Sequence, residues 1–162
     1  MPFFNMQTAE QIENYCAQQG LDDLKRLKTR MFNFFKDMTQ KSTYSKHQIT
    51  AIDKAIEDHL NKIAQNKLEI ASANARNSEI LGSLPGNGAE RYLALQALHY
   101  PTNIQSEHEE DLKKLNQSKE VHKTRIAAIN LELNACLPEL QIVDKYIDAK
   151  TPVVQVQNMM MA

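Results

Sequence analysis

The chain has 162 residues, enough for one domain with its own core, and its net charge of −1 is close to neutral. Phosphate binding normally needs a strongly basic surface, so this balance argues against nucleic acid as a partner. Aromatic residues make up only 6%, tryptophan is absent and there are four glycines. Because glycine is the usual residue of tight turns, so few of them disfavour a fold rich in β-hairpins.

Cys16 and Cys136, the two cysteines, indicate a reducing compartment. They make no disulfide framework, and both fall on apolar helix faces, where small buried thiols are expected. No apolar run approaches the roughly 18 residues of a membrane span, and residues 1–6 lack the features of a cleaved signal peptide. We therefore expect a soluble protein that is cytoplasmic, or secreted without a cleaved signal peptide.

A short first helix is predicted at about 9–19. Thr8 and Gln11 form a capping-box pattern at its start, and Gly20 is placed to end it. Its apolar stripe, made by Ile12, Tyr15 and Cys16, is narrow. Such a helix is marginal alone, so we expect it to dock on the rest of the chain.

The second predicted helix, at about 22–40, has one apolar side and one basic side. Apolar residues recur every three or four positions: Leu21, Leu24, Leu27, Met31, Phe34, Phe35 and Met38. A candidate membrane or partner face comprises Lys25, Arg26, Arg30, Phe32 and Lys36. Three interpretations follow. The helix is a core helix with its lysines in solvent, or a basic amphipathic helix, residues 24–41, that lies on an anionic membrane or in a partner's groove. The third is a contact with an anionic ligand or nucleic acid, for which Phe32 and Tyr44 could stack on bases.

A long helix is predicted at about 46–81, after a polar break at 42–45. Ser45 and Gln48 form a second capping box at its start. Its inward seam is mostly apolar with polar interruptions: Ile49, Ile52, Ile56, His59, Ile63, Asn66, Ile70, Ala73, Asn77 and Ile80. At about 1.5 Å per residue this helix is too long for a small globule, so it needs an equally long partner helix.

Residues 82–88 contain three of the four glycines and are predicted to be a connector. No Lys-Ser or Lys-Thr follows the last glycine, so the segment is not a phosphate-binding loop. A short helix at about 89–99 follows. It is expected to end before Pro101, because the residue before a proline avoids the helical conformation.

The last long helix is predicted at about 103–149 by an unbroken heptad register from His108 to Ile147. Pro138 is expected to kink this helix without ending it. Residues 151–162 are expected to form a flexible tail. In that tail Val153, Val154 and Val156 are candidate contacts with a partner.

The two long helices are predicted to pair in antiparallel fashion through residues 82–102. A symmetrical hairpin would place Ile70 near Leu115 and Ile63 near His122. The polar positions of the two seams would then meet in one layer, made by His59, Asn66, Lys119 and His122. We interpret this layer as setting the register at some cost in stability, so its replacement by leucine should raise thermal stability. The alternatives are a different register and a ligand-binding or pH-sensing site.

The five histidines show no metal-binding spacing such as His-x-x-x-His or Glu-x-x-His. His108 is surrounded in sequence by Glu107, Glu109 and Glu110, and we interpret it as part of a charged helix face. Nucleotide-binding and nucleophile motifs are also absent from the sequence. We therefore expect no enzyme, no cofactor, and no catalytic, cofactor-binding or metal-binding residues.

The sequence thus predicts an all-α fold: an elongated helical bundle built on an antiparallel, coiled-coil-like pair of long helices, with residues 1–150 as a single domain. The expected function is protein binding without catalysis, as an adaptor, scaffold or regulatory subunit that presents a helical face or groove. The leftover apolar stripe also allows a homodimer. The alternative function is that of a membrane-surface protein or secreted bacterial effector that uses the basic helix 24–41.

Overall fold

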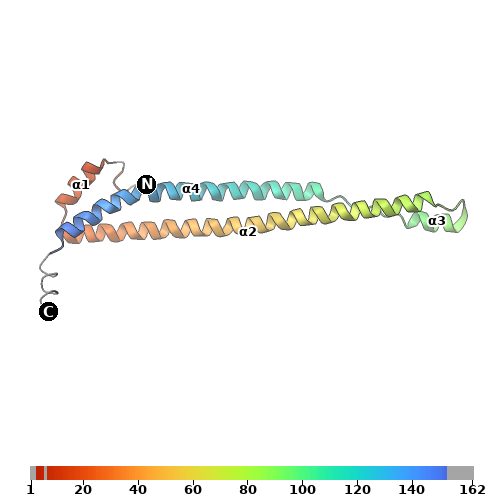
Figure 1. Cartoon of the computed structure of the whole chain (residues 1–162), viewed down its shortest axis with the longest axis horizontal. Coiled ribbons are helices and arrows are strands. Elements are labelled where there is room, and N and C mark those ends of the chain that lie inside the picture. The colour runs from red at the N-terminus through yellow and green to blue at the C-terminus, as the bar shows by residue number, and fades with distance from the viewer. Residues whose placement is uncertain (1–2, 6, 153–162) are drawn as a thin grey trace, which may run out of the picture. The chain divides into compact units, whose positions relative to one another are not determined.

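The computed structural model describes residues 3–5 and 7–152 (Figure 1). Within these residues the chain forms four helices and no strand: α1 (Ala9–Gln18), α2 (Leu21–Gly82), α3 (Gly88–Gln96) and α4 (Gln105–Lys150). The long helices α2 and α4 pack against each other in opposite directions, since Lys28 pairs with Asp144 and Ser45 with His122. The fold is therefore the all-α helical bundle that the sequence predicts. The candidate tail contacts Val153, Val154 and Val156 lie outside the described residues.

α1 begins with the capping box expected at Thr8. The Gln11 N–H donates to Oγ1 of Thr8 at 3.2 Å, and the Thr8 N–H donates to Oε1 of Gln11 at 2.9 Å. These two bonds satisfy donors that the start of a helix leaves unpaired. The helix also docks as expected, because Ile12 and Cys16 are buried in a core shared with α2 and α4.

α2 is one continuous helix of 62 residues, so the predicted break at 42–45, between helices at 22–40 and 46–81, is wrong. Between Leu21 and Leu81 the sequence has no glycine or proline that would end a helix. Ser42 and Ser45 are only 6% and 2% exposed. The two serines are thus buried positions of one helix rather than parts of a loop.

The described residues form two compact units, each containing part of α2 and part of α4. The first unit combines the chain up to His47 with the chain from His122 onward, and the second is Gln48–Val121. The region 1–150, expected as a single domain, therefore comprises two units.

The first unit holds the main hydrophobic core. The largest fully buried side chains all belong to it: Leu24, Met31, Val143, Cys16 and Cys136. Complete burial of a side chain such as Leu24 contributes roughly 1.5–3 kcal/mol. Leu140 and Ile147 of α4 complete this core around α1. The docking of α1 is thus supported by both long helices.

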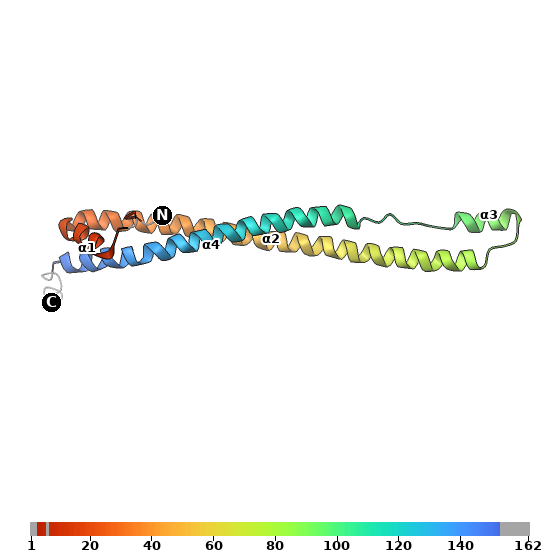
Figure 2. The same cartoon turned by 90° about the horizontal axis from the view of Figure 1, so that it is seen from above.

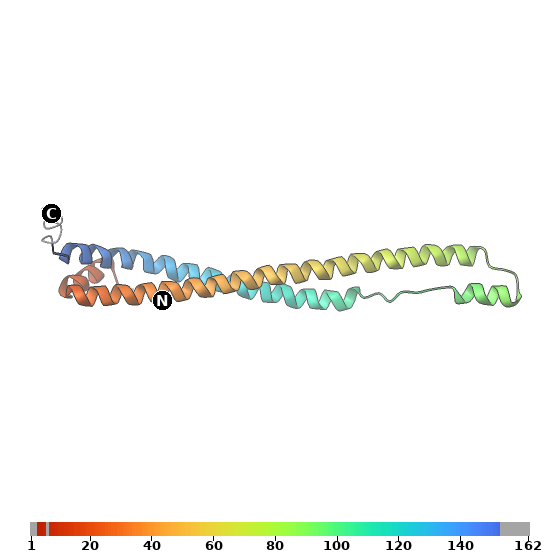
Figure 3. The same ribbon diagram turned by 90° about the horizontal axis from the view of Figure 1, so that it is seen from below.

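In the second unit α2 packs against α4 and also against residues 98–104, which run along it in extended form (Figures 2 and 3). Two buried asparagines of α2, here called the asparagine pair, hold this segment. Asn77 exchanges two hydrogen bonds with the backbone of His99, at 2.8 and 3.1 Å. Asn66 donates to the carbonyl oxygen of Thr102 at 2.9 Å and accepts from the N–H of Ile104 at 3.2 Å. These two polar seam positions therefore bind backbone instead of a facing helix.

The predicted register between α2 and α4 is wrong, and the extended segment accounts for part of the offset. Lys119 Nζ lies 2.6 Å from Oδ1 of Asp53, more than three turns of α2 away from its expected neighbour Asn66. The segment from His99 to Ile104 spans the same length as about 11 residues of α2. The reason is that an extended residue advances about 3.3 Å and a helical residue about 1.5 Å. A hairpin made of helices alone has no such offset.

α4 continues through Pro138 without ending there, as expected. By length and composition it contains a stretch that could cross a membrane, with a mean hydropathy of 1.2 over 18 residues. The expectation that no segment approaches a membrane span is therefore wrong for this stretch of α4, as judged by length and composition alone. Core helices of soluble proteins pass the same test, and 28% of this stretch is buried.

Candidate functional site

A surface groove with a volume of about 630 Å³ lies between α2 and α4 in the first unit, and we call it the helix groove. Apolar surface comes from Met38, Tyr44, Ala128 and Ile129. Charged side chains of both signs also line it: Asp37, Lys41, Arg125 and Glu132. Tyr44 is 59% exposed, so the helix groove is open to solvent along this side.

Residues 3 and 4 pack on the same face of the helix pair as the helix groove. The Phe3 ring meets Phe34 of α2 edge-on with centroids 5.3 Å apart, and the Phe3 N–H donates to Oε2 of Glu139 on α4 at 2.8 Å. Phe34 and Lys41 are seven residues apart, as are Glu139 and Glu132, and residues seven apart in a helix share a face. The helix groove therefore continues a surface that the first residues of the chain cover.

Burial shifts the titration of three groups in the first unit. It raises the pKa of the Glu139 carboxyl, against the opposing effect of the backbone N–H groups of Phe3 and Phe4. It also raises the pKa of the Cys16 and Cys136 thiols. A raised thiol pKa lowers the fraction of thiolate at neutral pH.

The predicted polar layer of His59, Asn66, Lys119 and His122 is not one layer. His122 lies beside the helix groove, with Nδ1 3.3 Å from Oγ of Ser45. Lys119 pairs with Asp53, and Asn66 belongs to the asparagine pair. His59 contacts His108. The physical reason is the register offset described above, which brings a different partner to each residue.

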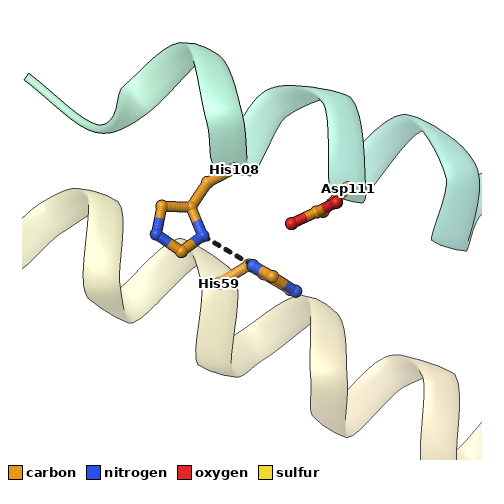
Figure 4. A group of neighbouring side chains, drawn as sticks. All are labelled: His59, His108 and Asp111. Atoms are coloured by element: carbon orange, nitrogen blue, oxygen red, sulfur yellow. Dashed lines mark hydrogen bonds between the residues drawn. The ribbon is translucent and has the colours of Figure 1, made fainter.

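His59 of α2 and His108 of α4 face each other in the second unit (Figure 4). Their Nδ1 atoms are 2.6 Å apart and their ring centroids 4.9 Å apart. Asp111 follows one turn along α4 and directs its carboxylate toward the same place (Figure 4). One ligand atom from each of the three residues lies within 4.8 Å of the others. Since imidazole and carboxylate are ligands of transition metals, we call this group the histidine cluster and treat it as a candidate metal centre.

Sequence reasoning missed the histidine cluster and placed His108 on a solvated helix face. The two histidines are 49 positions apart on different helices, so no spacing motif joins them. The sequence offered one signal for this site: His59 and His108 both occupy seam positions, which face a neighbouring helix. Only the correct register shows that these two positions meet.

The basic candidate face of α2 lies on the surface. Lys25, Arg26, Arg30 and Lys36 are exposed, and Phe32 is 51% exposed beneath the ammonium group of Lys28. The apolar side of the same helix is occupied, because Leu24 and Met31 are fully buried. A membrane-surface helix needs its apolar side for lipid. The arrangement therefore favours a core helix with basic side chains in solvent.

No family model matches this chain, and neither a curated protein nor a solved structure matches it. A helical bundle alone does not specify a function, since folds of this kind serve many. The function therefore has to be inferred from the helix groove and the histidine cluster themselves.

Proposed function

We propose that this protein is a non-enzymatic protein-interaction module whose helix groove receives an amphipathic helix of a partner protein. One observation carries the proposal. The helix groove continues, on the same face of α2 and α4, a surface that the chain's own N-terminal residues cover nearer the end of the helix pair. The partner would thus extend a packing arrangement that this protein already uses.

α1 illustrates that arrangement. It places Ile12 and Cys16 into the core formed with α2 and α4, and Phe3 extends the contact to Phe34 and Glu139. However, α1 has only 10 residues, and nothing in the described part of the chain covers the groove. A further helix there would bury apolar surface that a pair of helices leaves exposed.

The lining of the helix groove suits a helix better than a small molecule. Met38, Ala128 and Ile129 offer apolar surface to side chains spaced i, i+3/i+4 and i+7 on a docked helix. The charged residues of both signs at the groove favour a partner whose flanking charges are also mixed. Small-ligand pockets bury roughly 70–90% of their ligand, which an open groove does not achieve.

Photocrosslinking tests the proposal. Tyr44 is replaced by p-benzoylphenylalanine, which an exposed aromatic position accommodates, and the full chain is irradiated in extract from its source cells. We expect crosslinks to an amphipathic helical segment of another protein, located by mass spectrometry. A synthetic peptide of that segment should bind the purified chain, as measured by fluorescence anisotropy.

Two variants of neighbouring exposed alanines on α4 provide the matched comparison. Ala128→Glu places a charge in the helix groove and should weaken peptide binding at least tenfold, about 1.4 kcal/mol. Ala127→Glu adds the same charge about 100° around the helix and should leave binding unchanged. Crosslinks only to a second copy of the chain, or only to its residues 153–162, would overturn the proposal. Equal binding by the two variants, or no crosslink at all, would also overturn it.

A further inference from the structure

We propose that His59, His108 and Asp111 bind one divalent transition-metal ion of the zinc class (Figure 4). The residues belong to the second unit, whereas the helix groove belongs to the first, so this site is separate from the proposed protein-binding function. Its ligands come from α2 and α4, and an ion held between them would join the two helices.

The two imidazole rings are placed to share a ligand. Their Nδ1 atoms are 2.6 Å apart, whereas two nitrogen ligands of a tetrahedral zinc ion, with bonds of about 2.0–2.1 Å, lie about 3.3 Å apart. A shift of each ring by a few tenths of an ångström is enough to admit the ion. Both Nδ1 atoms then offer lone pairs to the metal, and the proton of each neutral ring resides on Nε2.

Asp111 supplies a third, negatively charged ligand. It follows His108 by three residues and therefore lies on the same face of α4. Its side chain is exposed, so it can rotate toward an ion without disturbing the packing. Two imidazoles and one carboxylate leave a fourth position for water, which is a common ligand set of zinc. Nitrogen ligands also disfavour magnesium and calcium, which prefer oxygen.

The backbone that carries His108 is held by the helix that carries His59. The His108 N–H donates to the carbonyl oxygen of Ile104 at 3.3 Å, and the Ile104 N–H donates to Oδ1 of Asn66 at 3.2 Å. Asn66 lies two turns beyond His59 on α2. The separation of the two histidines is therefore set by the fold before an ion arrives, which favours binding.

Metal titration of the full chain, first treated with a chelator, tests the proposal. Co²⁺ should produce the visible absorption of a four-coordinate site with nitrogen and oxygen ligands, and Zn²⁺ should displace it at one equivalent. Calorimetry should also report one Zn²⁺ per chain. At 100 times its dissociation constant, Zn²⁺ should raise the melting temperature by about 5 °C or more, because it binds only the folded pair of ligating helices.

Variants locate the ion. His59→Ala and His108→Ala should each weaken Zn²⁺ binding by more than tenfold, and Asp111→Asn should weaken it about tenfold. His47→Ala removes the other histidine of α2, which is exposed, and should leave Zn²⁺ binding unchanged. Because Asp111 is exposed, its variant keeps the test valid if a histidine variant fails to fold, which circular dichroism would show. Absence of binding, or equal binding by His47→Ala and Asp111→Asn, would overturn the proposal.

Discussion

Lys150, the last residue of α4, holds the C-terminal end of α1. Its ammonium group donates to the carbonyl oxygens of Cys16 at 2.9 Å and Ala17 at 3.0 Å, and also contacts that of Gln19. The last carbonyls of a helix lack partners within the helix and carry partial negative charge. A cation from a distant part of the chain thus completes a helix that is too short to be stable alone.

We predict that Lys150→Met lowers the free energy of unfolding by about 1–3 kcal/mol, because several carbonyl groups lose a charged donor. Urea denaturation followed by circular dichroism measures the change. Lys145→Met is the matched control. The Lys145 side chain is 71% exposed, and its Nζ lies 3.4 Å from Oε1 of Glu13. Exposed ion pairs contribute little, so Lys145→Met should lower the free energy of unfolding by less than about 1 kcal/mol. Equal losses in the two variants would contradict the capping role of Lys150.

The asparagine pair shows how α2 serves two kinds of neighbour. Asn66 and Asn77 are three turns apart and therefore lie on one face of α2, where they are 7% and 4% exposed. A carboxamide carries both a donor and an acceptor, so it can bind an N–H and a carbonyl group of an extended chain at once. Hydrophobic seam residues, in contrast, suit a facing helix. The asparagines thus mark where α2 changes from one neighbour to the other.

The asparagine pair reverses one expectation from the sequence. Asn66→Leu, expected to raise stability as part of a polar layer, should instead lower the free energy of unfolding by about 1–3 kcal/mol, because backbone groups of Thr102 and Ile104 lose their partner. Hydrogen exchange at the Ile104 amide should accelerate at the same time. Asn61→Leu, at an exposed position of the same helix, is the control and should have little effect on either measurement. Stabilisation by Asn66→Leu would contradict a stabilising role for the hydrogen bonds of Asn66.

Across the whole molecule, buried apolar surface is distributed unequally between the two units. The largest fully buried side chains lie in the first unit, while the buried hydrophobic residues of the second unit are Ile52, Ile63 and Ala73. The described part of α3 has no buried residue, and Tyr92 and Leu93 on it are 63% and 64% exposed. Local stability follows buried contacts, so the units should differ in how readily they open.

We predict slower amide hydrogen exchange in the first unit than in the second. Helical amides of α2 before His47 and of α4 after His122 should remain protected longer than those of residues 48–121, because opening the first unit exposes more apolar surface. Exchange monitored by mass spectrometry compares the part of α2 before His47 with the part after it. Because both parts belong to one continuous helix, the comparison does not depend on differences between separate helices. Equal protection along α2 would mean that the helix opens as one cooperative element.

The sequence by itself determined the all-α fold and most helix ends. Heptad spacing predicted the long helices and their antiparallel packing, the Thr8 and Gln11 pattern predicted the start of α1, and the glycines at 82–88 predicted the connector before α3. These signals are local, because periodicity, capping and turn chemistry depend on residues close together in the chain. The wrongly predicted break at 42–45 arose from the same kind of signal, since serine favours caps and turns, whereas Ser42 and Ser45 are buried inside α2.

Only the tertiary structure decided which seam residues meet. The register of α2 against α4 depends on the extended form of residues 98–104, where each residue covers about twice the length that a helical residue covers. The extended residues contribute about six residues to the offset that places His108 opposite His59 and separates Lys119 from Asn66. The histidine cluster and the helix groove follow from this long-range alignment, which no local pattern of residues encodes.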